Sequence, residues 1–397
     1  MANKNLTNAK RAKNDEFYTQ YDDIQKEIEA YLEYNPNTFR GKVVYCNCDD
    51  PFESNFFRYF VLNFDKLGLK QLITTSYKPS PIANTQLSLL GDDKTLTKLK
   101  GRPKITANKF IINEVHDIDG DGEFNLKDIA LQLKSNKNNE WEPLGGDGDF
   151  RSEECINLLK RSDIVITNPP FSLFREYIKQ LVCDKKKFLI IGNLNAITYK
   201  EVFPLLKENI VWLGNNYKVN AGAMFFEIPE YIANLEQVRE IKTNESGKKV
   251  YITRVQGVRW FTNLDHGRRH QPLPLMTMAE VIKFATKKPF EKYDNYDAIE
   301  VSLVKNIPSD YKGVMGVPVS FLDKYSPEQF EIIGMCENED LYNLKTKVYK
   351  TAECKQAYHE KFKKKGTYDM NASGVVIRNG LSEKVYQRVL IKHKKRR

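Results

Sequence analysis

Short hydrophobic runs alternate with amphipathic stretches over the first two thirds of the chain. The runs are rich in β-branched and aromatic residues and have the length of buried strands. They lie at residues 43–45, 72–75, 164–167 and 188–192. Apolar residues at helical spacing lie between them, near 22–33, 56–64, 152–160 and 173–182. This alternation is typical of a parallel sheet covered by helices on both faces, so the pattern predicts an α/β fold.

The later part of the chain shows a different pattern. Four more apolar runs follow closely upon one another, which predicts that the sheet finishes with antiparallel strands. They lie at 210–213, 223–228, 250–255 and 258–262. Residues 79–150 are polar and rich in turn-forming residues, and we interpret them as an insertion. A polar stretch from Asp265 to Pro272 marks the boundary between a first domain, residues 1–264, and a second domain, residues 265–397.

The composition is that of a water-soluble protein. The 397 residues are 41% hydrophobic, with a mean hydropathy of −0.55. No stretch approaches the roughly 20 apolar residues that a membrane-spanning helix needs, and the first 15 residues lack the apolar core of a signal peptide. We therefore expect a cytoplasmic protein with no membrane partner. The cysteines are scattered, which favours reduced thiols over a metal site; they are Cys46, Cys48, Cys155, Cys183, Cys336 and Cys354.

Positive charge is concentrated at the end of the sequence. The formal net charge is +10, and residues 351–397 contain 13 lysine or arginine residues against 4 aspartate or glutamate residues. A concentrated basic segment suits a polyanion such as nucleic acid, because each neutralised phosphate releases condensed counterions. For the last six residues, 392–397, a solvated tail is the alternative interpretation.

The candidate chemistry lies directly after the strand predicted at 164–167. The next four residues are Asn168, Pro169, Pro170 and Phe171, and ligands of open α/β sheets bind at the carboxyl ends of the strands. The two prolines hold this loop extended, because each ring fixes φ and removes an N–H donor. A nucleophilic amine offers two N–H donors, and the Asn168 side-chain oxygen and the Pro169 carbonyl supply two acceptors. Phe171 can stack on a planar substrate.

Such a loop can polarise an exocyclic amine or an amide for attack on a methylsulfonium. No strong general base is needed, because the proton can leave after methyl transfer, and catalysis then comes from alignment and polarisation. A base inside a duplex cannot reach a pocket of this kind, so a nucleic-acid substrate must be flipped out of the stack. An ordinary turn is the alternative, and the strand before the loop and the helix after it disfavour a plain turn.

The arrangement of strand, Asn-Pro-Pro-aromatic loop and helix resembles the amino-methyltransferases of nucleic acids. Beyond the loop, the chain resembles the EcoRI-type family of adenine-specific DNA methyltransferases, and the matching stretches lie within residues 13–230. They are 14–20, 45–51, 54–56, 145–152 and 174–177. The resemblance implies a Rossmann-like S-adenosylmethionine-dependent methyltransferase sheet with a C-terminal α+β target-recognition region. It also implies methyl transfer to N6 of a flipped-out adenine in double-stranded DNA.

The resemblance further implies which residues bind the cofactor. Phe17, Tyr18 and Thr19 resemble the N-terminal motif that lies against S-adenosylmethionine, and Asp149 with Phe150 resembles the pair that binds its adenine. The end of the first strand, where the methionine part sits, is made of Cys48, Asp49, Asp50 and Pro51. The chain departs from the usual pattern here, because no glycine-rich turn follows the first strand. Residues 75–77, at the end of the second strand, contain no acid, so the ribose contact is unassigned.

A second signal lies inside the predicted insertion. Residues 117–128 have carboxylates at loop positions 1, 3, 5 and 12 and a glycine at position 6, which is the spacing of an EF-hand-like calcium loop. The ligands implied are Asp117, Asp119, Asp121 and Asp128. An acidic surface turn is the alternative. If Ca²⁺ binds here, we expect a structural role, because methyl transfer from a sulfonium needs no metal.

The loop alone leaves other substrates open. RNA, cytosine N4 in DNA, a protein glutamine amide and a catalytically silent DNA-binding relative all remain alternatives, and the basic residues after 264 favour DNA. We assign residues 265–397 to target recognition by position and charge. A cognate restriction endonuclease encoded nearby would be a functional partner, although a solitary methylase fits equally. One flipped adenine needs one active site, so we expect a monomer.

Overall fold

The structure of the protein is a computed structural model. It describes residues 18–48, 54–77, 107–118, 120, 128–129, 131, 138–215, 223–228, 238–243, 249–285 and 289–394. The chain divides into two compact units. The first contains residues 1–203 and 211–267, and the second contains residues 204–210 and 268–397.

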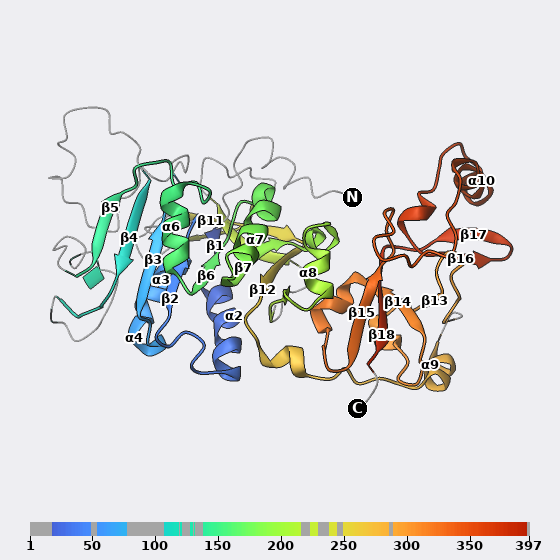
Figure 1. Ribbon diagram of the computed structural model, residues 1–397, viewed down its shortest axis with the longest axis horizontal. Helices are drawn as coiled ribbons and strands as arrows, with labels where there is room; N and C mark the ends of the chain where they lie inside the picture. Colours follow the sequence, from blue (N-terminus) through green and yellow to red (C-terminus); the bar gives the residue numbers. More distant parts are fainter. Residues whose placement is uncertain are drawn as a thin grey trace. The chain divides into compact units, whose positions relative to one another are not determined.

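The first unit is built on a mixed sheet of eight strands in the order β5-β4-β3-β2-β6-β7-β12-β8 (Figure 1). Its four central strands are parallel, and they correspond to the four apolar runs expected from the sequence: β3 (Gln71–Thr75), β2 (Val43–Cys46), β6 (Ile164–Thr167) and β7 (Lys187–Asn193). Antiparallel pairings extend both sides, through β4 (Asn108–Ile112), β5 (Glu140–Pro143), β12 (Val258–Thr262) and β8 (Trp212–Leu213).

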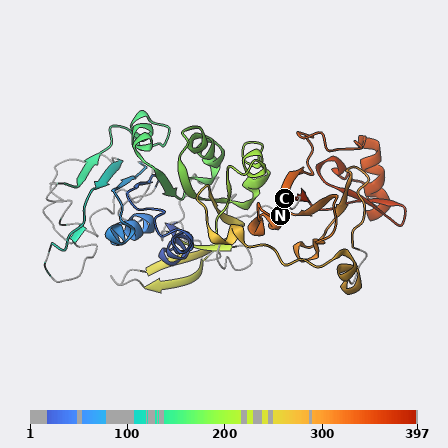
Figure 2. The ribbon, with the colours of Figure 1, turned by 60° about the horizontal axis from the view of Figure 1, so that its bottom comes forward.

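Helices cover both faces of this sheet (Figure 2). On one face lie α2 (Tyr21–Tyr34), α3 (Asn55–Leu62) and the single turn α4 (Phe64–Leu67); on the other lie α6 (Glu153–Arg161) and α7 (Phe174–Cys183). Serine caps start two of them, because the Ser54 and Ser152 side chains accept backbone N–H groups of the first turn. Two shorter helical segments follow in the chain: η3 (Leu194–Thr198) belongs to the first unit, whereas residues 204–207 of α8 (Phe203–Lys207) belong to the second.

A second sheet of four antiparallel strands packs on the α2 side of the first unit. Its order is β1-β9-β11-β10, with β1 at Tyr18–Thr19, β9 at Ala223–Ile228, β11 at Lys249–Gln256 and β10 at Val238–Thr243. Met224, Phe226 and Val255 from this sheet share one buried core with Ile24 and Ile28 of α2. The expected antiparallel finish is therefore divided between two sheets: β12 and β8 end the large sheet, whereas β9 and β11 form the small one.

The polar segment 79–150 is more than an insertion. β4 and β5 lie inside it and extend the large sheet, and Phe110 and Ile112 of β4 are fully buried. The β5 strand is an exposed edge with one half-buried tryptophan, so its sequence carries no strong strand signal. The sequence pattern did not predict this strand because an edge strand is stabilised by pairing with its neighbour, here β4, more than by its own hydrophobic pattern.

From residue 268 on, the described part of the second unit combines a four-stranded sheet with a hairpin and two helices. The sheet order is β13-β14-β18-β15, with strands Ala298–Glu300, Val314–Pro318, Arg388–His393 and Phe330–Met335 respectively. The hairpin is β16 (Val375–Arg378) and β17 (Leu381–Lys384), and the helices are α9 (Met278–Phe284) and α10 (Thr351–Phe362). Short 3-10 turns lie at Gly267–His270, Val304–Asn306, Val319–Lys324 and Met370–Ala372.

The basic end of the chain is part of this fold. β18 is hydrogen-bonded to β14 on one side and to β15 on the other, and Val389, Leu390 and Ile391 are buried. Lys392 and His393 complete the strand, so the interpretation of residues 392–397 as a solvated tail is wrong for its beginning. Residues 395–397 lie outside the described residues.

All six cysteines are free thiols, as expected. Four are buried, Cys48 is half-buried and Cys183 is exposed. No helix among the described residues is long and apolar enough to cross a membrane.

Candidate active site

The carboxyl ends of β2 and β6 lie side by side at the centre of the large sheet. The chain places β3 on one side of β2 and then crosses to place β6 on the other. This makes a topological switch between β2 and β6, and open α/β sheets bind their ligands just outside the carboxyl ends at such a switch. Cys48 follows β2 and Asn168 follows β6, so two of the segments singled out from the sequence meet there.

The Asn-Pro-Pro-Phe loop continues directly from β6. Thr167 ends the strand and is fully buried, whereas Asn168 is half-buried. Pro169 is buried, and Pro170 and Phe171 are half-buried. Phe171 packs partly against the hydrophobic core of the unit. It opens a 3-10 turn, η2 (Phe171–Leu173), which leads into α7. The Leu173 N–H donates to the Pro170 carbonyl at 3.0 Å. The expected order of strand, loop and helix is confirmed.

A chain of hydrogen bonds ties this loop to the end of β2. The Thr167 hydroxyl donates to the backbone carbonyl of Asn47, and the Tyr177 hydroxyl of α7 donates to Oδ1 of the same asparagine. All three residues are almost fully buried, with exposures of 0%, 3% and 1% for Thr167, Asn47 and Tyr177. The position of the loop relative to β2 is therefore set by buried hydrogen bonds as well as by the sheet.

The loop of residues 145–150 lies over the end of β3. Gly148 has a φ of +79°, and a Cβ built on it would lie 2.0 Å from the Ser76 carbonyl oxygen, so only glycine permits this close approach. The loop leads into Phe150, which is 4% exposed. Its ring meets the Tyr177 ring edge to face, with centroids 4.9 Å apart. The structure thus brings Asp149 and Phe150 to the edge that carries Asn168.

Arg151 contacts both members of this pair. Its guanidinium binds the Asp149 carboxylate through two hydrogen bonds and reaches Glu176 at 3.0 Å. Its Cζ lies 5.3 Å from the centre of the Phe150 ring, within the range of a cation–π contact. Hydrogen bonding from Arg151 holds the pKa of the Asp149 carboxyl below its ordinary value. Asp149 is therefore ionised over a wide pH range.

The N-terminal motif reaches the start of α3. The Thr19 carbonyl accepts a hydrogen bond from Asn55 Nδ2 at 2.9 Å, and Tyr18 pairs with Glu227 in the small sheet. Thr19 is 3% exposed, and within the described part of the chain its hydroxyl has no hydrogen-bond partner. The remaining cofactor residues named from the sequence lie outside the described residues; they are Phe17, Asp49, Asp50 and Pro51.

Two residues at this edge were assigned no role from the sequence. Asn47 stands between two cysteines in the matching stretch 45–51, and Tyr77 follows β3, where an acidic residue was expected. Burial raises the pKa of the Tyr77 hydroxyl; Asp147 and Asp149 raise it further, while Arg151 lowers it. Tyr77 therefore lies among the charged side chains of the 145–151 loop. The strand order could have pointed to both residues, because each ends a parallel strand next to β6 or β2.

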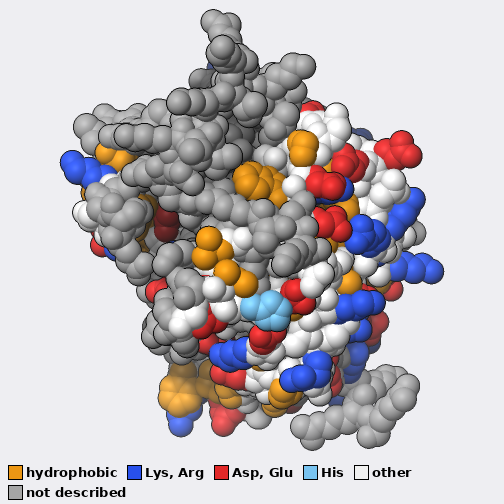
Figure 3. Space-filling view, turned by 90° about the vertical axis from the view of Figure 1, so that its left-hand side faces the viewer, with side chains coloured by type: hydrophobic (Ala, Val, Ile, Leu, Met, Phe, Trp, Pro, Cys, Tyr) orange, Lys and Arg blue, Asp and Glu red, His pale blue; other side chains and the backbone are white. Residues whose placement is uncertain are grey.

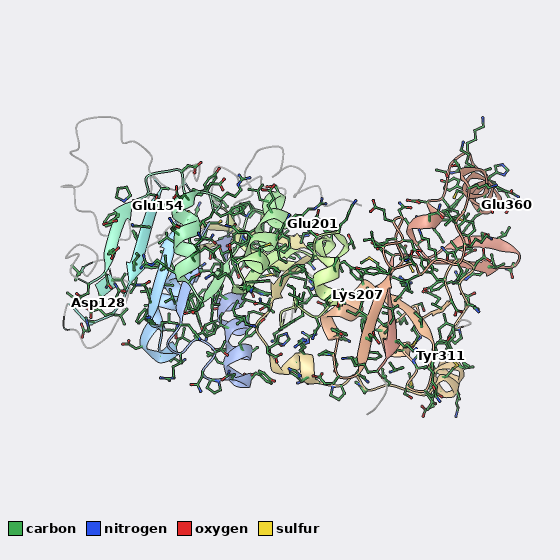
Figure 4. The ribbon with its side chains drawn as sticks, viewed as in Figure 1. Asp128, Glu154, Glu201, Lys207, Tyr311 and Glu360 are labelled. Atoms are coloured by element: carbon green, nitrogen blue, oxygen red, sulfur yellow. The ribbon has the colours of Figure 1, made fainter. Side chains whose placement is uncertain are left out.

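The calcium prediction is not supported by the described residues. Asp119 and Asp121 lie outside them, and among the rest no cluster of three metal-ligating side chains occurs. Asp117 and Asp128 each accept a backbone N–H, from Gly120 at 2.7 Å and from Ile118 at 2.8 Å. Asp128 lies at the end of the unit that carries β4 and β5 (Figure 4). Acidic and basic side chains are interspersed over the described part of that end (Figure 3).

Comparisons with known proteins agree with the resemblance. The sequence model of the family described as adenine-specific methyltransferase EcoRI matches residues 5–394. The type II methyltransferase M.EcoRI of Escherichia coli is 46% identical over 342 residues, which are 86% of this chain and 92% of that protein. The type II methyltransferase M.MpnI of Mycoplasma pneumoniae is 37% identical over 343 residues, 86% of this chain and 89% of that protein. No solved structure matches the chain significantly.

Proposed function

The chain belongs to the EcoRI family of adenine-specific methyltransferases, and we propose that residues 168–171 form its catalytic loop. The protein is an S-adenosylmethionine-dependent DNA adenine methyltransferase. One observation carries the loop proposal: the Asn-Pro-Pro-Phe segment continues from a central parallel strand at the topological switch of the sheet.

The large sheet supports a Rossmann-like methyltransferase core. Its parallel strands run in the order β3-β2-β6-β7, with helices on both faces, and antiparallel β12 separates β7 from β8. We propose that residues 1–264 act as the catalytic domain and residues 265–397 as the target-recognition domain.

The residues at the carboxyl edge fit the cofactor. Gly148 brings the 145–150 loop against the end of β3, and the buried Thr19 hydroxyl has no partner among the described residues. We propose that Thr19, with residues 17–18 and 48–51, holds the methionine part, while Asp149 accepts the adenine amine. The Phe150 ring would stack on the adenine, which requires the Arg151 side chain to leave that face. When bound, the cofactor supplies an electrophilic methyl group on sulfur.

Catalysis by the chain itself consists of holding the target amine. The Asn168 side-chain oxygen and the Pro169 carbonyl accept its two N–H groups, which directs the nitrogen lone pair toward the methyl group. Phe171 stacks on the flipped adenine, and its packing against the core keeps the ring in place. No side chain has to act as a strong base, because the proton can leave after transfer. Alignment and polarisation therefore supply most of the rate.

The target adenine must leave the duplex to reach this loop. Flipping costs a few kcal/mol of stacking and pairing, which contacts in the pocket offset. We propose that the second unit supplies the contacts to phosphates and base edges that hold the duplex, as its exposed lysines at 363–365 suggest.

The relatives named type II methyltransferases suggest the biological setting. We propose that the protein methylates its site as part of a restriction-modification system, with the cognate endonuclease as a functional partner, and that it acts as a monomer in the cytoplasm. Calcium binding by residues 117–128 remains a prediction from the ligand spacing, with a structural role only.

The direct experiment incubates the protein with mixed genomic DNA and methyl-labelled S-adenosylmethionine, then identifies the labelled nucleoside. We expect label in N6-methyladenine, and its positions give the recognition sequence. Label in N4-methylcytosine would contradict the adenine assignment. DNA binding without label in DNA would point to RNA or protein substrates.

A further inference from the structure

A buried side-chain amide lies at the carboxyl end of β2. Asn47 is 3% exposed and follows the last residue of the strand. The Tyr177 hydroxyl donates to its Oδ1, which fixes the oxygen of the amide toward α7. The NH₂ group then points the other way, and within the described part of the chain neither of its N–H donors has a protein acceptor. A buried amide in a ligand-binding edge thus presents two donors.

Both N–H donors of this amide are available to a ligand. A charged acceptor forms the stronger hydrogen bonds with such donors. The ligand expected at the end of β2 has such an acceptor, since the methionine part of S-adenosylmethionine ends in a carboxylate. Its ribose and adenine offer only neutral acceptors.

We propose that the Asn47 amide binds the carboxylate of the cofactor's methionine part, with Tyr177 and Thr167 as positioning residues. The inference rests on the proposed cofactor site and extends it to a residue that the sequence did not single out. Tyr177 sets the orientation of the amide, and its ring contacts the Phe150 ring at the adenine end. One tyrosine therefore contacts residues at both ends of the proposed cofactor site.

Thr167 connects the same asparagine to the catalytic loop. The Thr167 hydroxyl donates a hydrogen bond to the Asn47 carbonyl, and the next residue in the chain is Asn168. Asn47 thus connects β2, whose end holds the methyl donor in the proposed site, to β6, which positions the target amine. We expect changes here to alter the distance between the two reacting groups without removing a reacting group.

The test compares two ligands on isosteric variants by calorimetry. The ligands are S-adenosylhomocysteine and its decarboxylated form, which keeps the amine and lacks only the carboxylate. Asn47→Asp retains the acceptor for Tyr177 but replaces the NH₂ donors with an anion. We expect it to weaken S-adenosylhomocysteine by about 10- to 100-fold, the worth of a hydrogen bond to a charged group. The decarboxylated ligand should not be weakened, because it has no carboxylate for the amide to bind and the new anion attracts its ammonium group.

The outcomes separate the inference from the proposed function. Equal weakening of both ligands, or of neither, would overturn the role of Asn47. Failure of the unaltered protein to bind S-adenosylhomocysteine would instead contradict the cofactor site itself. Asn47→Ala repeats the comparison without the added negative charge.

Two further variants test the positioning residues. Tyr177→Phe should reduce S-adenosylhomocysteine affinity more than that of the decarboxylated ligand, whereas Tyr31→Phe, which removes a buried hydroxyl bonded to Glu27, should leave the ratio unchanged. Thr167→Val should lower kcat with little change in the cofactor KM. Thr167→Ser, which keeps the hydroxyl, should have a kcat close to that of the unaltered enzyme. Equal ligand ratios in the two tyrosine variants, or a Thr167→Ser enzyme as slow as Thr167→Val, would contradict the positioning role.

Discussion

Arg151 donates two parallel hydrogen bonds to the carboxylate of Asp149, from Nε to Oδ1 at 2.9 Å and from Nη2 to Oδ2 at 2.7 Å. The same guanidinium lies over the Phe150 ring. A flat group with two N–H donors therefore covers the carboxylate and the ring that we assign to the cofactor's adenine. We therefore expect cofactor binding to depend on pH, through the Asp149 carboxylate, and on where the exposed Arg151 side chain lies.

Arg151→Ala should move the acid limit of cofactor binding to higher pH. Arg151 keeps the pKa of Asp149 below its ordinary value, so the carboxylate remains an acceptor as the pH falls. Without the guanidinium the pKa rises toward its ordinary value, and protonation removes the acceptor at a higher pH. Calorimetry with S-adenosylhomocysteine, over the acid range in which both proteins stay folded, measures the shift.

At neutral pH the same variant should change affinity by less than about fivefold, since an exposed ion pair is worth roughly 0–1 kcal/mol. Arg175→Ala is the control, because Arg175 contacts Tyr199 and Glu201 and not Asp149. Superimposable pH profiles for the Arg151 variant and the unaltered protein would contradict the role of Asp149.

The buried pair of Glu300 and Arg388 should dominate the stability of the second unit. Arg388 Nη2 lies 2.6 Å from Glu300 Oε1, both side chains are under 10% exposed, and the Tyr293 hydroxyl also donates to Glu300. Arg388→Ala leaves a buried carboxylate unpaired and should lower the free energy of unfolding by about 3–5 kcal/mol. Urea unfolding followed by far-ultraviolet circular dichroism measures it.

Arg378→Ala is the matched control for that variant. Arg378 is likewise ion-paired, here with the two carboxylates of Glu291 and Glu383, but its side chain is 44% exposed, so the loss should be roughly 0–1 kcal/mol. Equal losses in the two variants would show that burial of the Glu300 pair does not decide its contribution.

Three lysines after α10 should contribute to DNA binding through phosphates. Lys363, Lys364 and Lys365 are exposed, whereas deleting residues 351–397 would remove the central strand β18 and unfold the unit. Changing the three lysines to glutamine should weaken DNA binding and flatten its dependence on salt. The slope of log affinity against log salt should fall by about 0.9 for each phosphate that the variant no longer neutralises.

The control for this charge change is Lys42, Lys66 and Lys70, changed together to glutamine. These lysines are also exposed, and Lys42 and Lys70 precede β2 and β3 at the edge opposite the proposed catalytic loop. Equal salt slopes for both triple variants would show that residues 363–365 do not contact the phosphates.

Calcium binding by residues 117–128 has a simple test. The ligand spacing predicts one saturable site in a calorimetric titration of the intact protein, and Asp128→Asn should weaken it by removing a carboxylate. Asp128 also accepts the Ile118 N–H, which asparagine can still do through its side-chain oxygen. A titration without heat would end the hypothesis.

The sequence predicted the centre of the fold well because that centre is made of local signals. Val43, Val44 and the 164–167 run are buried on both faces of a parallel sheet, so their strands read as continuous apolar segments. The loop at 168–171 was found for the same reason, since it follows such a run immediately. Ser54 and Ser152 cap helices in the ordinary way, and those helices stand where expected.

The elements that were missed depend on contacts between distant residues. β5 is an exposed strand that pairs with β4, and the lysine-rich composition near residue 390 concealed the buried core of β18. Asn47 and Tyr77 acquire a role only when the strand order places β2 and β3 beside β6. Arg151 is visible in the sequence, but its contact with the Phe150 ring follows from the fold of the 145–151 loop.

The most direct test of the account is single-turnover methylation of DNA by Asn168→Ala, with N6-methyladenine as the product measured. We predict a loss of about 100-fold or more, the size expected when one polarising group is removed from an active site. Binding of DNA and of S-adenosylhomocysteine should stay within about twofold, and so should the activity of the Asn195→Ala control, an exposed asparagine after β7. A variant that keeps more than a few per cent of the activity would show that Asn168 does not hold the target amine.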